Sequence, residues 1–476
     1  MTWAIHAAAP LLMVAVFFAA TALPIRAGAA SPTEAHRVVD EAEQRADADP
    51  SGRVGNLQVC GSTGGLSSRA LTIETAVDGS LRVTRSQLID RIDGDASGGT
   101  TGGLGGRLYV VDTDRDYLPG GEPPIPGSLR DAILRARKSR SPAWIAVRGS
   151  LRGHEIALKA PLRVPSDVTL DATCAGVSLV AAPEVMLVGI VGVRNVVIAG
   201  FRMHKTPYSG ENKGRADGKD FRDCITVSGQ VDALAILNNE FGACGDGQID
   251  ITSGVGREMP KAGGRITVAF NRFLRHDKAM LVGTDGCVDH AGSLTAGCSL
   301  ESGAAAPGYR VTFEGNAFLW TGQRNPRAFG LVDITLVNNV FVFEPYDRGN
   351  GTRGASYGQY VSNGARVRAR SNVYVGAINR GAERPLGLFM PSTPGASAVG
   401  GDIDGTIEAS GNLRFADEII AGDDAATAGP SAGGALDTHR PDMRRLGVAG
   451  AIACIVAHAG PDAGVDWPER LCGKHR

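Results

Sequence analysis

This sequence of 476 residues has few aromatic residues, few long apolar runs and almost no net charge. Aromatic side chains make up only 5% of it, and acidic and basic residues nearly cancel to a formal net charge of -1. Balanced charge argues against a general nucleic-acid-binding role. Beyond the first 30 residues no stretch is long and apolar enough to span a bilayer. We therefore expect no nucleic-acid partner and no membrane-spanning segment in the mature chain.

Cysteine patterns typical of zinc sites are absent as well, because no CxxC or Cys/His spacing occurs. An even number of cysteines in an exported chain favours disulfides. Neighbours in sequence are the natural pairs, especially Cys287 with Cys298 and Cys454 with Cys472, although connectivity cannot be deduced from sequence. The eight cysteines are Cys60, Cys174, Cys224, Cys244, Cys287, Cys298, Cys454 and Cys472.

The N-terminus has the pattern of a targeting segment. An apolar run extends from Ala7 to Leu23, and the small residues Ala27 to Ala30 offer a cleavage site. A retained membrane anchor is the alternative, but the run is short and is interrupted by Pro10 and flanked by Pro24. We predict a signal peptide over residues 1–30 and a secreted protein, extracellular or periplasmic.

Glycine is abundant, with 65 residues spread among Val, Ile and Thr runs, which indicates many tight turns between short strands. Residues 31–105 begin with an Ala-rich, charged sequence and continue with a Gly/Ser/Thr-rich sequence. This composition predicts a flexible or loosely packed low-complexity extension. Order is expected from a strand at Arg107–Val111 onward. We predict one domain over residues 106–476, with the segment after Met443 packed back on it.

One helix is expected before the strands. Ser128 and Asp131 provide a start resembling a capping box. A single helix in this position would suit a cap over the open end of a stack of strands. Its apolar residues recur at the i, i+3, i+4 and i+7 positions, namely Leu129, Ala132, Ile133 and Ala136.

From Asn195 onward a short segment recurs that starts with β-branched residues and closes on an aromatic ring. Each copy is too short to bury its own apolar face, so the copies must stack into an all-β solenoid with irregular loops. We expect the repeated Asn to adopt the left-handed turn conformation and to hydrogen-bond from coil to coil, with the rings as an interior column. A β-sandwich is the alternative. The Asn lies two residues before the ring in five copies: Asn239, Asn271, Asn316, Asn339 and Asn372.

Three acids stand out by position. Asp246 and Asp250 are four residues apart, which places them on one face of a strand, and Asp223 begins an earlier segment that could lie on the neighbouring coil. Three converging carboxylates repel one another unless a cation is present, and oxygen-only ligands suit calcium. The alternative is that these are ordinary turn residues.

Basic residues follow in the next coils. Lys278 comes after the next Asn-x-Phe unit, and Arg324 and Arg327 flank Pro326. If the coils stack, these cations lie on the same side as the acids, where a polyanionic substrate would make them complementary to the site. Solvated surface charge is the alternative, and for Arg327 it has equal weight.

From about Pro126 to Tyr374 the chain resembles the pectate lyases of polysaccharide lyase family 1, with a weaker similarity at AHAGPDAGVD from Ala457. The order and spacing of the pieces carry the resemblance. They are PGSLRDAI at Pro126, WIAVRGSL at Trp144, LRVPSDVTLDA at Leu162, VRNVVIAGFRM at Val193, DGQIDIT at Asp246, VAFNRFLRHDKAMLVG at Val268 and VTFEGNAFLWTGQRNPR at Val311.

The resemblance implies a right-handed parallel β-helix that cleaves α-1,4-linked polygalacturonate by β-elimination with calcium, giving 4,5-unsaturated products. It also implies roles for named residues. Lys278 matches the substrate-binding lysine of the HxK motif and Arg324 the proposed base, the first arginine of RxPxxR. The calcium carboxylates would be Asp223, Asp246 and Asp250.

The implied chemistry removes the C5 proton of a uronate, so negative charge develops beside a carboxylate. Calcium and Lys278 would withdraw that charge and acidify the proton. A guanidinium normally stays protonated far above neutrality, so a base such as Arg324 predicts an alkaline optimum.

The chain also departs from the family pattern. Phe329 replaces the second arginine of RxPxxR, so a substrate-contacting cation is missing unless Arg327 takes that part. Asn238 and Asn239 replace an Asp-His pair, and Phe221 replaces an acid. A lyase for esterified pectin or another polyuronate, and a non-catalytic polysaccharide-binding β-helix, therefore remain as alternatives. We expect a monomer.

Overall fold

The computed structural model describes residues 71–173, 175–205, 222–252, 264–283, 308–343, 358–362, 365–375, 389–391, 406–410, 412–415, 454–456 and 459–461. Predictions for the signal peptide, the Cys287–Cys298 pair and Cys472 lie outside the described residues.

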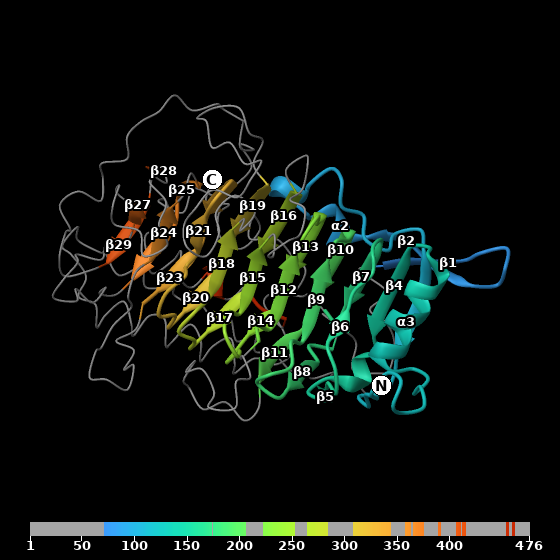
Figure 1. The fold of residues 1–476 in the computed structure, drawn as a ribbon. Coiled ribbons are helices and arrows are strands. Elements are labelled where there is room, and N and C mark those ends of the chain that lie inside the picture. Colours follow the sequence, from blue (N-terminus) through green and yellow to red (C-terminus); the bar gives the residue numbers. More distant parts are fainter. Residues whose placement is uncertain are drawn as a thin grey trace, which may run out of the picture.

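Three parallel sheets, here called A, B and C, run side by side along the molecule, and successive coils add one strand to each (Figure 1). Sheet A contains β1 (Leu71–Thr75), β2 (Leu81–Ser86), β3 (Arg107–Val111), β4 (Ala143–Val147), β7 (Val168–Asp171), β10 (Arg194–Ala199), β13 (Asp232–Leu237), β16 (Gly264–Ala269), β19 (Tyr309–Glu314), β22 (Val332–Val337), β25 (Arg366–Arg370) and β28 (Thr406–Ser410). Only the β1–β2 and β2–β3 pairs of this sheet are antiparallel within the described residues.

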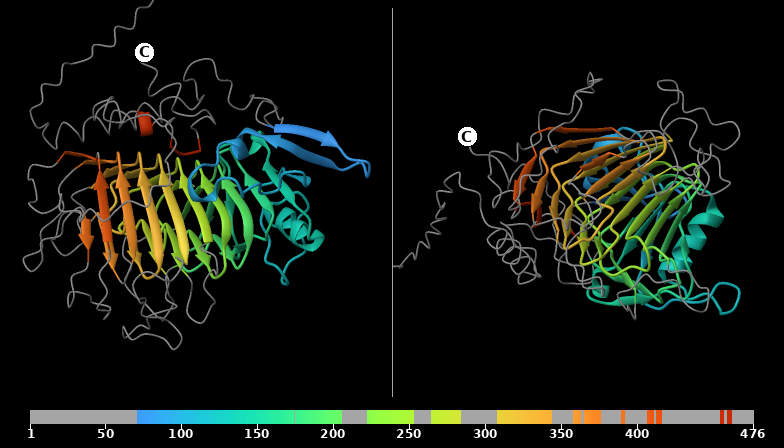
Figure 2. Two further views of the ribbon diagram at one scale, coloured as in Figure 1. Left: turned by 90° about the horizontal axis from the view of Figure 1, so that it is seen from above. Right: turned by 60° about the vertical axis from the view of Figure 1, so that its left-hand side comes forward.

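Sheets B and C complete each coil. Sheet B contains β5 (Glu155–Ala157), β8 (Ser178–Ala181), β11 (Arg202–Lys205), β14 (Glu240–Phe241), β17 (Arg272–Leu274), β20 (Ala317–Leu319), β23 (Val340–Val342), β26 (Val373–Val375) and β29 (Leu413–Phe415). Sheet C contains β6 (Leu162–Arg163), β9 (Val188–Val191), β12 (Ile225–Ser228), β15 (Ile249–Thr252), β18 (Met280–Gly283), β21 (Arg327–Phe329), β24 (Gln359–Ser362) and β27 (Phe389–Pro391). The fold is the parallel β-helix implied by the family resemblance, and Figure 2 shows it from above and obliquely along its length.

The interior is a set of columns in which equivalent residues of successive coils pack on each other. In sheet A one such column consists of Ile198, Ile236, Val268, Phe313 and Leu336, all paired in register and almost fully buried. Because side chains alternate with period two, a shift of one residue would turn the whole column outward. Burial of the columns therefore fixes the register of the coils.

The repeated asparagines form a buried ladder, as predicted. Asn316 accepts hydrogen bonds at its Oδ1 from the backbone N–H and from Nδ2 of Asn271, at 2.9 and 3.1 Å, and its own Nδ2 donates to Oδ1 of Asn339 at 2.9 Å. The predicted left-handed conformation at these asparagines is wrong. It occurs one residue earlier, at Phe270 (φ 56°) and Asn338 (φ 55°), so the turn is made before the ladder residue.

The aromatic column lies beside this ladder, also as predicted. Ring centroids are 5.1, 4.5, 4.6 and 4.9 Å apart along the series, with interplanar angles of 8–18°. Such nearly parallel rings are consistent with stacking between adjacent coils. The members are Phe241, Phe273, Phe318, Phe341 and Tyr374.

The predicted capping helix is α3 (Leu129–Ser139), and it lies at the N-terminal end of the solenoid (Figure 1). The Ser128 side chain accepts the N–H of Asp131 at 3.2 Å, which is the expected N-cap. The four apolar residues predicted to face inward, from Leu129 to Ala136, are all buried. The described helices include none long and apolar enough to cross a membrane.

Residues 71–105 differ from the expectation of a loosely packed extension. They form the β1–β2 hairpin, α2 (Gln87–Asp90) and the 3₁₀ turn η1 (Gly94–Ala96), and the hairpin projects past the capped end in Figure 2. A second 3₁₀ turn, η2 (Gly149–Leu151), follows β4.

The segment after α2 lies against the outer side of sheet A. The Ala96 N–H donates to the Thr267 hydroxyl at 3.1 Å, and the Gly102 N–H donates to Asn195 Oδ1 at 2.7 Å. Glycine permits this approach, since a Cβ at Gly103 would lie 1.9 Å from the Ala143 carbonyl oxygen. The glycine-rich segment that was predicted to be a flexible extension is therefore a place of close backbone packing.

Near the C-terminus, Ile455, Val456 and Ala459 are buried against the outer residues of sheet B. The Gly460 N–H donates to the Phe270 carbonyl at 2.8 Å, which attaches this segment to a coil turn.

Replacement of Asn316 by Ala should lower the free energy of unfolding by about 3 kcal/mol, because two buried donors of Asn271 lose their acceptor. Urea unfolding followed by circular dichroism measures this change. The control Arg310→Ala, at a partly exposed position on β19, should change it by less than about 0.5 kcal/mol. Equal losses in both variants would contradict the importance of the ladder.

Candidate functional site

Three carboxylates come together on the sheet C side of the solenoid. One ligand oxygen from each of Asp223, Asp246 and Asp250 lies within 4.8 Å of the others. Asp250 is in β15, and Asp223 precedes β12, the strand paired with β15. The expectation that Asp246 shares a strand with Asp250 is wrong, because Asp246 lies in the turn before β15, yet its carboxylate still joins the group.

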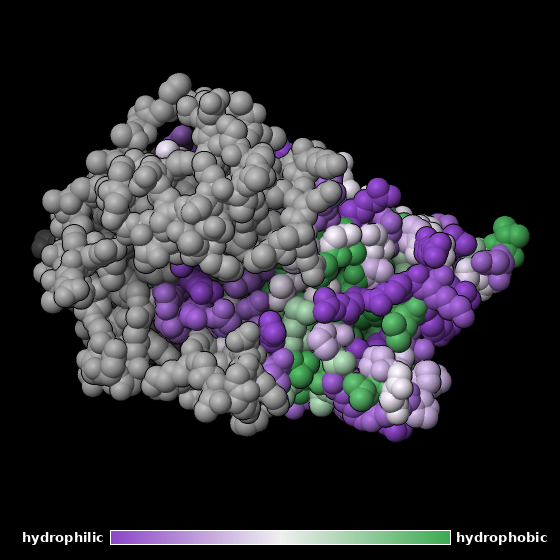
Figure 3. Space-filling model, in the orientation of Figure 1, coloured by the Kyte–Doolittle hydropathy of each residue, from purple (hydrophilic) through white to green (hydrophobic). Residues whose placement is uncertain are grey.

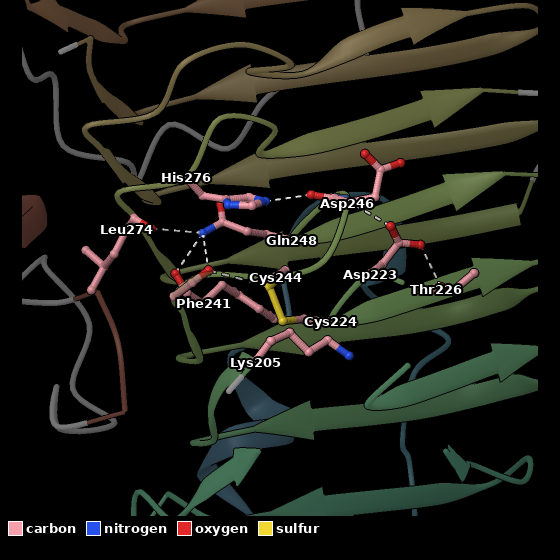
Figure 4. Close-up of a disulfide and its surroundings, with 12 residues drawn as sticks. Lys205, Asp223, Cys224, Thr226, Phe241, Cys244, Asp246, Gln248, Leu274 and His276 are labelled. Atoms are coloured by element: carbon pink, nitrogen blue, oxygen red, sulfur yellow. Dashed lines mark hydrogen bonds between the residues drawn. A yellow bond between two sulfur atoms is a disulfide. The ribbon is translucent and has the colours of Figure 1, made fainter. Parts of the chain in front are cut away.

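The two turns that carry Asp223 and Asp246 are held by several contacts, shown in Figure 4. A disulfide joins Cys224 to Cys244, with their Cα atoms 5.4 Å apart. It pairs neighbours in sequence, in line with the expected pattern. The fully buried His276 ring places Nε2 2.6 Å from the Asp246 carbonyl oxygen. These contacts fix the backbone from which both carboxylates project. Cys454 is also disulfide-bonded.

Burial works against ionisation of two of the carboxylates. It raises the pKa of Asp223 to about 6, although the Thr226 hydroxyl and the Gly247 N–H donate to this carboxylate at 2.7 and 3.0 Å. Burial, followed by repulsion from Asp223, raises the pKa of Asp250 well above its ordinary value. Both groups would thus be stabilised in their charged form by an additional cation.

Asp246 behaves in the opposite way. Burial acts to raise its pKa, but the charge of Arg324 and the hydrogen bond from Lys278 outweigh burial and lower the pKa. Lys278 Nζ lies 2.6 Å from Asp246 Oδ1. The site therefore contains one carboxylate that is well compensated and two that are not.

Arg324 approaches the carboxylates from the coil of β21, two coils beyond Asp250. Its Nη1 lies 3.6 Å from Asp250 Oδ2 and 3.7 Å from Asp246 Oδ2, and the side chain is 14% exposed. The backbone has a left-handed φ of 58° here, and the Arg324 carbonyl accepts the Met280 N–H at 2.7 Å. Five of the six predicted residues, from four successive coils, thus lie in one cluster.

Arg327 is the sixth predicted residue and lies outside this cluster. It is on β21 in the same register row as Asp250, separated from it by Leu281 of β18. Its guanidinium carbon is 5.4 Å from the ring centroid of Tyr360 and 6.0 Å from that of Phe329. Within the described residues it has no carboxylate partner.

The carboxylate cluster fits a calcium ion by its donors. It supplies only oxygen ligands, in a spacing that one ion could bridge, and two of the acids are destabilised as anions without added positive charge. Hydrophilic residues are visible over the β15–β18 part of the molecule in Figure 3. This composition is compatible with a charged ligand.

Sequence reasoning missed two residues that support the site. Thr226 holds Asp223 through its hydroxyl, and its position three residues after the acid is the only sequence signal. Lys205 of β11 is buried, donates to the Val185 carbonyl, and has its pKa lowered to about 7 by burial despite the charges of Asp223 and Glu184. No local pattern indicates that role.

Known proteins similar to this chain share a name. The chain is 30% identical over 302 residues to pectate lyase 1 of Juniperus ashei, covering 60% of this chain and 70% of the relative. It is 30% identical to pectate lyase 1 of Hesperocyparis arizonica over 53% of this chain and 62% of the relative. It spans less than half the length of two relatives from Arabidopsis thaliana, 47% and 46%. No family model matches the chain.

Solved structures similar to this chain include the cedar pollen allergen jun a 1. The sequence identity is 19% and the TM-score 0.46, and the match covers 80% of this chain and 94% of that one. A Bacillus sp. N165 pectate lyase in complex with trigalacturonate gives 18% identity and 0.45, over 78% and 99%. The parallel sheets and the converging acids define a parallel β-helix protein with an acidic cluster on one of its sides. On the Juniperus ashei relative, the chain belongs to the pectate lyases of polysaccharide lyase family 1.

The opposite pKa shifts predict opposite effects of two matched substitutions in metal-free protein. Asp250→Asn should raise the unfolding temperature at pH 7 by a few degrees, because it removes a carboxylate whose charged form is disfavoured by burial. Asp246→Asn should lower it, because it removes a carboxylate stabilised by Lys278 and Arg324.

The size of each change in unfolding temperature depends on pH. A carboxyl whose pKa is raised in the fold contributes stability that is complete below its unfolded pKa of about 4 and is lost as the pH rises through the folded value. For Asp246 the contribution is instead lost as the pH falls. Differential scanning calorimetry in a chelator at about pH 4 and pH 7 should show both differences shrinking at the lower pH. The same sign for both variants at pH 7 would contradict this electrostatic account.

Proposed function

We propose that this protein is a secreted, calcium-dependent pectate lyase that cleaves α-1,4-polygalacturonate by β-elimination and leaves 4,5-unsaturated oligogalacturonides. The observation that supports it most is the convergence of three carboxylates with Lys278 and Arg324 on one side of a solenoid of the pectate lyase family. Separate coils supply these groups, so only the stacked fold assembles them.

Asp223, Asp246 and Asp250 would hold the ion. When bound there, calcium would supply positive charge that offsets the negative charge developing beside the uronate C5 atom. The three acids also exclude a polyanion from the site unless their charge is compensated, since like charges repel across a short distance. Substrate and cation binding are therefore expected to depend on each other.

Lys278 would bind the substrate through its ammonium group. Its Nζ is 2.6 Å from Asp246 and keeps donors available for a second acceptor, because an ammonium has three. A hydrogen bond to the uronate carboxylate would favour the electron-rich form that develops as the C5 proton leaves.

Arg324 would accept the C5 proton. Its side chain is 14% exposed and reaches the carboxylates from two coils beyond Asp250, so it would border a uronate bound at the cluster. A neutral guanidine is rare at neutral pH, which limits the rate there. Arg327, two strands from Asp250 in the same register row, would contact a more distant substrate carboxylate.

Calcium should stimulate the release of unsaturated product from polygalacturonate, measured by ultraviolet absorbance, and a chelator should abolish it. Calcium should also raise the unfolding temperature of the wild type, and Asp223→Asn should lose both effects. Activity on esterified pectin without calcium would instead favour a pectin lyase. No product from any uronate, with binding retained, would favour a non-catalytic binding module.

Replacement of Arg324 by Ala should reduce kcat by about 10²–10⁴-fold, because the proton acceptor is removed. Binding of polygalacturonate in calcium, measured by isothermal titration calorimetry, should change little. In the wild type, kcat should rise from about pH 7 to about pH 10 as the fraction of neutral guanidine grows. A flat profile, or turnover retained in Arg324→Ala, would remove Arg324 from the role of base.

A further inference from the structure

The outward face of sheet C changes character next to the carboxylate cluster. One register row passes from Asp250 through Leu281 and Arg327 to Tyr360. Side chains two residues apart on a strand share a face, so Phe329 lies on the same side as Arg327. The intervening residue, Ala328, is fully buried in the interior, which confirms that the other two face outward.

Phe329 lies along the sheet rather than projecting from it. A Cβ at Gly283, its partner on β18, would be 1.9 Å from Cε1 of the Phe329 ring, so the ring covers the Gly283 backbone. Leu281 lies two residues before Gly283 on the same strand and is half-buried. Phe329, Gly283 and Leu281 thus form an apolar surface, here called the Phe329 surface, that begins one strand from Asp250.

Among the residues that the structure describes, Arg327 supplies positive charge at one edge of this surface. The Arg327 guanidinium lies near the rings of Phe329 and Tyr360, at 6.0 and 5.4 Å. Its Nε atom is buried and has no hydrogen-bond acceptor among the described residues. Arg327 can therefore bind a ligand only through its two terminal nitrogen atoms. The guanidinium lies near the rings of both Tyr360 and Phe329.

A free carboxylate over the Phe329 ring would lose hydration, which is unfavourable, and Arg327 could offset this loss only from the edge of the surface, because its guanidinium carbon lies 6.0 Å from the ring centroid. A methyl ester at the same place carries no charge, and its methyl group would bury apolar area against the ring. Lys278 and Arg324 precede β18 and β21, the strands that carry Gly283 and Phe329. They require the opposite, a unit with a free carboxylate. Adjacent parts of one face thus favour different forms of the same sugar.

We propose that the Phe329 surface is a subsite for a methyl-esterified uronate unit, so that the preferred substrate is partly esterified galacturonan with a free carboxylate at the cleavage site. The proposal rests on the proposed lyase function and specifies its substrate. Arg327 marks the border of the subsite and takes the carboxylate of a unit on its other side.

The test compares kcat/KM on polygalacturonate with kcat/KM on pectin of intermediate esterification, both in calcium. Phe329→Arg should lower the pectin-to-polygalacturonate ratio about tenfold, because it places a cation where an ester binds. Phe329→Leu should keep the ratio within about twofold, since the surface stays apolar. The control Leu118→Arg adds the same charge at an exposed position near the capping helix and should leave the ratio unchanged.

A second measurement needs no variant. Mass spectrometry of wild-type products from partly esterified pectin should show a methyl ester enriched at one fixed position relative to the cleaved bond. Enrichment there together with the Phe329→Arg shift supports the subsite. A random ester pattern, or an unchanged ratio in an active Phe329→Arg enzyme, overturns it while leaving the lyase function intact. Absence of product from both polymers with the wild type would overturn the lyase function itself.

Discussion

Register between successive coils is the constraint on which the rest of this structure depends. A single coil has too little surface to enclose a core, so its apolar residues are buried only when the next coil presents equivalent residues at the same place. The column through Ile236 and Val268 enforces this in sheet A, and the asparagine ladder enforces it at the turn. Because each ladder amide both donates and accepts, a shifted coil would leave buried polar groups unpaired.

Register also creates the site. Asp250 is brought beside Asp223 because β12 and β15 pair in parallel, and Arg324 reaches Asp246 and Asp250 from two coils further on. The result is an uneven charge distribution. The charge of Arg324, together with Lys278, outweighs burial at Asp246 and lowers its pKa. At Asp223 and Asp250 burial dominates and raises the pKa. In the proposed function, such a site would bind a cation and an anionic polymer together, and neither one as strongly alone.

Local composition was misleading where backbone packing, rather than side chains, decides the structure. The Gly-rich text before residue 106 has the composition of a linker, yet Gly103 is needed because the chain passes close to Ala143. The left-handed residues were also misassigned to the ladder. Phe270 takes that conformation although its type does not suggest it, because the following Asn271 must point inward to continue the ladder. Both predictions were wrong because they used the residue type alone and not the residues that surround it in the folded structure.

What the sequence determined by itself was the repeat, the cap and the acidic and basic residues to examine as a candidate site. Periodic apolar residues and the Asn-x-aromatic unit are local patterns, so the stacked strands, the ladder, the ring column and α3 could be predicted from them. The acids and bases could be named from their types and from the family resemblance.

Only the tertiary structure decided how those residues meet, because contacts between coils depend on loop lengths that no local pattern encodes. It placed Asp246 in a turn and still within 4.8 Å of its partners, separated Arg327 from the cluster, and laid the Phe329 ring over Gly283.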